Sequence, residues 1–192
     1  MKFSTLVSFF KRLEETTSQT RMTEILSELF SEASEDDVDI VCYFVLGKIA
    51  PGYRDINLGL GDKMVTSALA LAAEKSEEEI ESRVQEEGSL SSLAAKLTIP
   101  WKDEYAGILP DANGLSVRDV HDGLMQIARV SGEGSQKEKK VILGALMEKA
   151  EEKERYYIIR LATGAMRLGA GDRTLLDGMS LAVSGSREKR PV

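Results

Sequence analysis

The chain has 192 residues, of which 42% are hydrophobic, and a formal net charge of −7. This length and composition suit one domain, or two closely packed halves, with a substantial core, and the acidic balance gives no overall signal for nucleic-acid binding. One cysteine and one histidine exclude a disulfide framework and a Cys/His zinc site. The sequence shows no signal peptide and no apolar run long enough to span a membrane, so we expect a cytoplasmic protein with no membrane partner and no metal.

Hydrophobic residues recur at helical spacing along most of the chain. In chain order, this spacing predicts helices over about 3–15, 20–32, from 35 into the apolar run that follows, 62–74, from 76 onward, 88–97, 115–130, 136–149, 153–166 and 172–183. A proline- and glycine-containing stretch, about 98–114, is predicted to connect two halves. Because no stretch alternates as strands do, the predicted fold class is all-α.

Two glycine turns resemble each other closely. Residues 58–72 and 168–182 align without a gap, and six of fifteen positions are identical. Each segment begins Leu-Gly-x-Gly-Asp and continues with a basic residue, Lys63 in the first copy and Arg173 in the second. A single Gly-x-Gly carries little information, whereas two copies at matched places indicate a duplicated framework.

The rest of the chain extends this duplication. Residues 3–49 align with 120–166 at a constant offset of 117 with nine identities, and the offset then falls to 110 because the first half has seven extra residues. We therefore predict one domain over residues 1–192 that contains an internal repeat, 3–74 and 120–184. The two halves of such a repeat are expected to pack about a pseudo-twofold axis.

The repeated turns predict phosphate binding. Each turn would bring backbone N–H groups and the positive end of the next helix toward a surface, with Lys63 and Arg173 just inside those helices and Arg167 before the second turn. Ser135, Gln136 and Lys137 begin another helix after a glycine-rich segment. A pseudo-twofold protein suits duplex DNA, whose backbones are related by dyads, and phosphate contacts position a duplex without reading its sequence.

The same residues also have structural explanations. The Gly-x-Gly turns can be ordinary helix connections, and Asp62, Asp172, Ser18 and Ser135 are candidates for helix N-caps. No nucleophile–histidine pair, Walker loop or metal-ligand cluster is present. The alternative function is an α-helical protein-interaction scaffold, which the acidic charge favours.

Four runs carry a family resemblance: 132–137, 163–169, 22–26 and 58–61. They resemble, in the family's order and over nearly the whole chain, the N-terminal DNA-binding domain of archaeal and eukaryotic-type ATP-dependent DNA ligases. The resemblance implies an all-helical pseudo-twofold domain that grips the minor groove on both sides of a nick, in an enzyme of DNA replication, repair and recombination. We expect a monomer that binds nicked double-stranded DNA, in the cytoplasm and associated with the nucleoid if the source is archaeal.

The resemblance, together with the turn analysis, assigns candidate DNA-binding residues to both halves. They are Asn57, Gly59, Gly61, Lys63, Ser135, Gln136, Lys137, Gly164, Arg167, Gly169, Gly171, Arg173 and Thr174.

Catalysis is expected to lie outside this chain. The family's catalytic lysine belongs to a Lys-x-Asp-Gly motif, which is absent, and 102–104 does not match it. We therefore interpret the chain as an excised domain with no catalytic residue and no cofactor of its own, the ATP and Mg belonging to the other domains of the parent enzyme. The sliding clamp is a candidate partner, although residues 97–109 contain Trp101 and Tyr105 without the glutamine pattern that relatives use to dock it.

Overall fold

The computed structural model describes residues 1–54, 56–110 and 113–186. These residues form ten α-helices, two short 3-10 helices and no β-strand, which confirms the all-α class. The helices are α1 (Phe3–Glu14), α2 (Gln19–Glu32), α3 (Val38–Val45), η1 (Gly52–Arg54), α4 (Asp62–Ala73), α5 (Glu77–Glu87), α6 (Leu90–Lys96), η2 (Asp103–Tyr105), α7 (Val117–Arg129), α8 (Ser135–Lys149), α9 (Glu152–Ala162) and α10 (Asp172–Ser184). Parts of the predicted domain and connector, 187–192 and 111–112, lie outside the described residues.

Two helix bounds differ from the sequence prediction by more than two residues. Helix α3 begins at Val38 rather than near 35, because Ser34 and Asp37 form a turn in which the Asp37 amide donates to the Ser34 carbonyl at 3.1 Å. Helix α9 ends at Ala162 rather than 166, because Gly164 takes a left-handed conformation with φ +68° that closes the helix. Local turn chemistry therefore overrides the hydrophobic spacing at both places.

The predicted N-caps are partly wrong. Ser18 does cap α2, its hydroxyl accepting the Arg21 amide at 3.4 Å. Asp62 and Asp172, however, are the first residues inside α4 and α10, and the N-caps are the glycines that precede them. Ser135 is likewise the first residue of α8, after a left-handed glycine N-cap.

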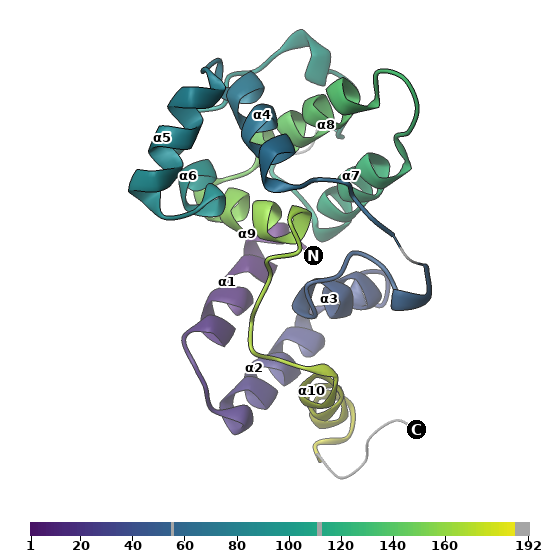
Figure 1. The fold of residues 1–192 in the computed structure, drawn as a ribbon. Helices are drawn as coiled ribbons and strands as arrows, with labels where there is room; N and C mark the ends of the chain where they lie inside the picture. Colours follow the sequence, from purple (N-terminus) through teal and green to yellow (C-terminus); the bar gives the residue numbers. More distant parts are fainter. Residues whose placement is uncertain (55, 111–112, 187–192) are drawn as a thin grey trace.

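The helices form two lobes, with α1, α2, α3 and α10 in one and α4 to α9 in the other (Figure 1). Two connections cross between the lobes: residues 46–61 lead from α3 to α4, and residues 163–171 lead from α9 to α10 (Figure 1). Each half of the sequence therefore places its last helix in the other lobe. Helix α4 packs on α8, and α10 packs on α2.

These contacts are reciprocal under the offsets of the repeat. Helices α2 and α8 are repeat equivalents, as are α4 and α10, so the α4–α8 and α2–α10 contacts correspond to each other. The α1–α9 contact corresponds to the α3–α7 contact in the same way. Lys2 and Ser116, the N-caps of α1 and α7, pair in an antiparallel β-bridge. A pseudo-twofold axis would produce this pattern, and the axis itself stays a prediction.

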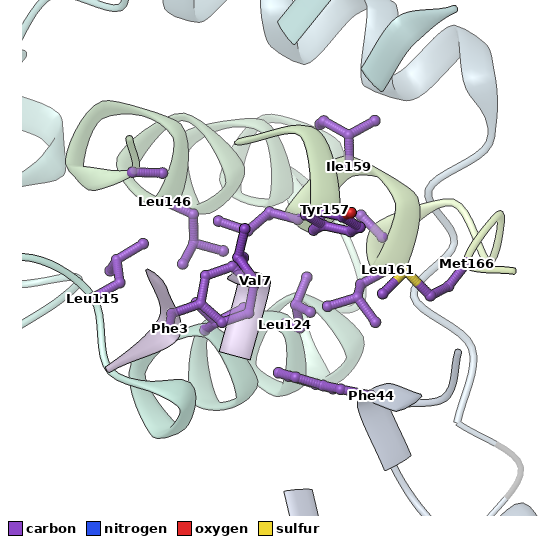
Figure 2. Close-up of a cluster of buried hydrophobic side chains, with 14 of the residues drawn as sticks. Phe3, Val7, Phe44, Leu115, Leu124, Leu146, Tyr157, Ile159, Leu161 and Met166 are labelled. Atoms are coloured by element: carbon purple, nitrogen blue, oxygen red, sulfur yellow. The ribbon is translucent and has the colours of Figure 1, made fainter. Parts of the chain in front are cut away.

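One hydrophobic core joins the lobes. Figure 2 shows side chains from α1, α3, α7, α8 and α9 meeting in a single cluster, among them Phe3, Phe44, Leu124, Leu146 and Tyr157. Phe3 and Phe44 meet edge to face with ring centroids 6.3 Å apart. Helices α3 and α9, from which the two crossing connections start, are both packed into this cluster, so each connection begins at a rigid helix.

Candidate nucleic-acid interface

The two crossing connections begin with the same turn. Gly47 and Gly164 both have φ +68°. After the first, the Lys48 amide donates to the Tyr43 carbonyl at 2.8 Å, and after the second, the Ala165 amide donates to the Arg160 carbonyl at 2.8 Å. Hydrogen bonds between residues five apart, with a left-handed glycine between them, form the Schellman motif. Candidate residue Gly164 therefore has a structural role that fully explains its identity.

The connections end in two matching turns, which we name the first corner (residues 57–63) and the second corner (residues 167–173). The first glycine of each Gly-x-Gly has a positive φ, +63° at Gly59 and +74° at Gly169, which favours glycine. The second glycines, Gly61 and Gly171, have extended φ values of −76° and −97° that any residue adopts. A Cβ added at either would meet nothing within 4 Å. The fold therefore requires the first glycine of each corner and does not explain the second.

Each corner presents the start of a helix to the surface. Gly61 and Gly171 are the N-caps of α4 and α10, and neither provides a side-chain cap, so the first-turn amides have no such partner. Free amides at the positive end of a helix form an anion site. The first helical residue is an aspartate in both corners, and its charge stabilises the free helix but repels an anion. The next residue, Lys63 or Arg173, is basic and attracts an anion.

The corners rest on equivalent positions of α8 and α2. The Lys139 ammonium donates to the Leu58 carbonyl at 2.8 Å, directly beneath the first corner. The repeat-equivalent residue, Met22, lies beneath the second corner, its Cε 2.9 Å from where a Cβ of Gly169 would be. The first corner is further held by Asn57, whose Oδ1 accepts the Gly59 amide at 2.8 Å.

A groove separates the two connections, and we call it the central groove. It is lined by 47–52, 56–61 and 161–164. This groove brings together four of the predicted residues, namely Asn57, Gly59, Gly61 and Gly164. Lys63, Arg167, Gly169 and Gly171 are exposed and do not line it.

The remaining candidates lie in two further grooves at equivalent places. Ser135, Gln136 and Lys137 line a groove between α8 and α4. Arg173 and Thr174 line a groove between α2 and α10. Thr174 is 8% exposed, and its hydroxyl donates to the side-chain oxygen of Gln19 at 2.7 Å. The predicted residues thus occupy three grooves and the exposed corners between them rather than one cavity.

Three cations at the corners form no ion pair within the described part of the chain. Lys63, Arg167 and Arg173 are exposed and form no ion pair with any carboxylate of residues 1–54, 56–110 and 113–186. Elsewhere many basic residues are neutralised, for example Arg12 by Glu28 at 2.5 Å. The corners therefore carry positive charge that is free to meet a phosphate even though the chain is acidic overall.

Sequence reasoning missed one residue of these surfaces. Lys48 is exposed and lines the central groove. The repeat offset offered a signal for it, since Lys48 follows the equivalent of Gly164. Gln19, which the sequence pairs with Gln136 at the start of a matching helix, is exposed in the α2–α10 groove.

The second connection is anchored to α9 and α1. Arg160 pairs with Glu14 and donates from Nε to the Ala165 carbonyl at 3.3 Å. Tyr157 donates its hydroxyl to Glu14 at 2.6 Å. Burial, reinforced by the Glu14 carboxylate, raises the pKa of Tyr157 well above its usual range, so this hydroxyl remains a donor.

The described residues contain no cluster of three or more His, Cys, Asp or Glu side chains arranged to hold a metal ion. Within the same residues, no helix combines the length and apolar character needed to cross a membrane.

Comparisons with known proteins identify the family of the chain. Residues 2–180 match the family described as "DNA ligase N terminus". The chain is 38% identical over its whole length to a probable DNA ligase of Aquifex aeolicus, 35% to DNA ligase 2 of Thermofilum pendens and 34% to a DNA ligase of Aeropyrum pernix. It spans about a third of the length of these relatives, 32% to 33%. The chain belongs to the family of DNA ligase N-terminal domains.

Proposed function

We propose that this chain binds nicked duplex DNA without sequence preference, as the DNA-binding domain of an ATP-dependent DNA ligase that seals nicks in replication and repair. The observation that carries the proposal is the pair of corners. Each combines a helix start without a side-chain cap, an N-cap glycine that the fold does not require, and an exposed cation that forms no ion pair among the residues that the structure describes. Family membership adds independent support.

In this proposal the corners hold the two backbones across the minor groove. First-turn amides of α4 and α10 donate to phosphate oxygens, and Lys63, Arg167 and Arg173 add charge. Gly61 and Gly171 let the backbone approach closely, because a side chain at either would project into open space. Contacts to phosphate and sugar bind all sequences about equally.

The other candidate residues contribute to DNA binding less directly than the corners. Ser135, Gln136 and Lys137 extend the phosphate-binding surface along the α4–α8 groove. Thr174 acts indirectly, because its hydroxyl is bound to Gln19. Gly164 shapes the connection that leads to the second corner.

Chemistry at the nick belongs to the rest of the parent enzyme in this proposal. ATP and Mg would bind there, and the domain described here would hold the duplex as a cytoplasmic monomer. The sliding clamp stays a candidate partner at the connector. Trp101 is 54% exposed there, with its ring centroid 6.2 Å from that of the buried Tyr105.

Binding of the chain to two nicked duplexes of unrelated sequence, measured by fluorescence anisotropy over a range of salt concentrations, tests the proposal. Each neutralised phosphate contributes about −0.9 to the slope of log affinity against log salt. We expect a slope of about −3 or steeper and nearly equal affinities for the two sequences. Absent binding, or a slope near zero, would contradict the proposal and favour the protein-interaction scaffold.

A further inference from the structure

Lys139 differs from Lys137, which lies two residues closer to the start of α8, in where its side chain lies. Its Nζ donates to the Leu58 carbonyl at 2.8 Å and lies 3.1 Å from the place that a Cβ of Gly59 would occupy. The side chain is half-buried, whereas Lys137 on the same helix is exposed. The charge of Lys139 is therefore directed beneath the first corner and not toward solvent.

The second corner has an apolar side chain at the position where the first corner has Lys139. The position equivalent to Lys139 is Met22, which is buried and whose Cε lies 2.9 Å from the Cβ position of Gly169. Lysine and methionine are both unbranched side chains, so they fill the space under the two corners in a similar way. Only lysine can donate a hydrogen bond to the backbone above it.

We propose that Lys139 is a positioning residue that holds the first corner in its DNA-binding conformation through the Leu58 carbonyl, and that it does not bind phosphate itself. This inference rests on the proposed function for its effect on DNA. Its structural part concerns the free protein, where the ammonium fixes the carbonyl just before Gly59 and thereby the path of the chain into α4. Gly59 is needed for its positive φ, and a Cβ there would in addition crowd Nζ at 3.1 Å.

The Lys139→Met variant, which gives the first corner the side chain found under the second, tests this role. In the free protein, hydrogen exchange is expected to accelerate several-fold at the amides of Gly59 and Val65, which donate to Asn57 Oδ1 and to the Gly61 carbonyl. Exchange at the Leu175 amide, the repeat equivalent of Val65, should be unchanged. Affinity for a nicked duplex should fall a few-fold with an almost unchanged salt slope, because no phosphate contact is lost. The conservative Lys139→Arg keeps a donor and should retain most of the protection.

The matched control is Lys137→Met, which removes the same charge from an exposed site on the same helix. It should leave exchange at the first corner unchanged and make the salt slope shallower by about 0.9. The inference is overturned if Lys139→Met produces this second pattern, or if it leaves exchange at the Gly59 and Val65 amides unchanged. Failure of every form of the chain to bind DNA would overturn the proposed function alone, because the exchange measurement needs no DNA.

Discussion

The first and second corners follow the same backbone path but are stabilised by different chemistry. In the first, Asn57 accepts the Gly59 amide and Lys139 donates to the Leu58 carbonyl, so polar side chains are used to hold the turn. In the second, the position equivalent to Asn57 is Arg167, which is exposed, and Met22 supports the turn by packing. Because packing by Met22 supports the second corner, no charged side chain is needed to hold that turn. Arg167 and Arg173 therefore stay exposed and can bind a ligand.

The largest expected effect comes from the cations of the second corner. Arg167→Ala with Arg173→Ala should weaken binding to nicked DNA about 100-fold, since a hydrogen bond to a charged group contributes about 1.5 kcal/mol, or roughly tenfold, for each arginine. The salt slope should become shallower by about 1.8. Anisotropy titrations across salt concentrations measure both quantities.

Lys63→Ala provides the comparison at the first corner. It removes one cation and should therefore cost about tenfold in affinity and about 0.9 in slope. An equal or greater loss than in the double arginine variant would contradict the idea that the second corner carries more of the charge.

An intermediate effect is expected at the N-cap glycines. Gly171→Ser should leave the melting temperature unchanged or slightly raised, because serine is at least as good an N-cap as glycine. Its side chain would nevertheless stand where a phosphate approaches, and its hydroxyl would compete for the same amides, so affinity should fall about tenfold. Gly61→Ser is the matched variant at the other corner. Unchanged affinity in both variants would mean that DNA does not approach these glycines.

The smallest effect is expected for Asn57→Ala. The variant loses one exposed hydrogen bond within the first corner, a net contribution of about 0.5–1 kcal/mol, and affinity should fall two- to fivefold with no change in salt slope. Calorimetric titration at fixed salt is sensitive enough to measure this change. A loss near 100-fold would instead make Asn57 a direct and dominant DNA contact.

The sequence predicted the helical class and the repeated glycine turns, because both depend on local patterns that a single segment carries. It could not predict what lies beneath the corners, because Lys139 and Met22 reach them only through the packing of α8 against α4 and of α2 against α10. Capping was also misjudged, since Asp62 matches the composition of an N-cap while the chain places Gly61 there. Tertiary packing, not propensity, decides what lies beneath the corners.

The central claim is that both corners contact one duplex at the same time. Amide NMR of the ¹⁵N-labelled chain, titrated with a single nicked duplex, tests this most directly through the resonances of Gly61 and Gly171. We expect both amides to shift and to saturate together at one duplex per chain. A shift at only one corner, or saturation of the two corners at different duplex concentrations, would contradict the account.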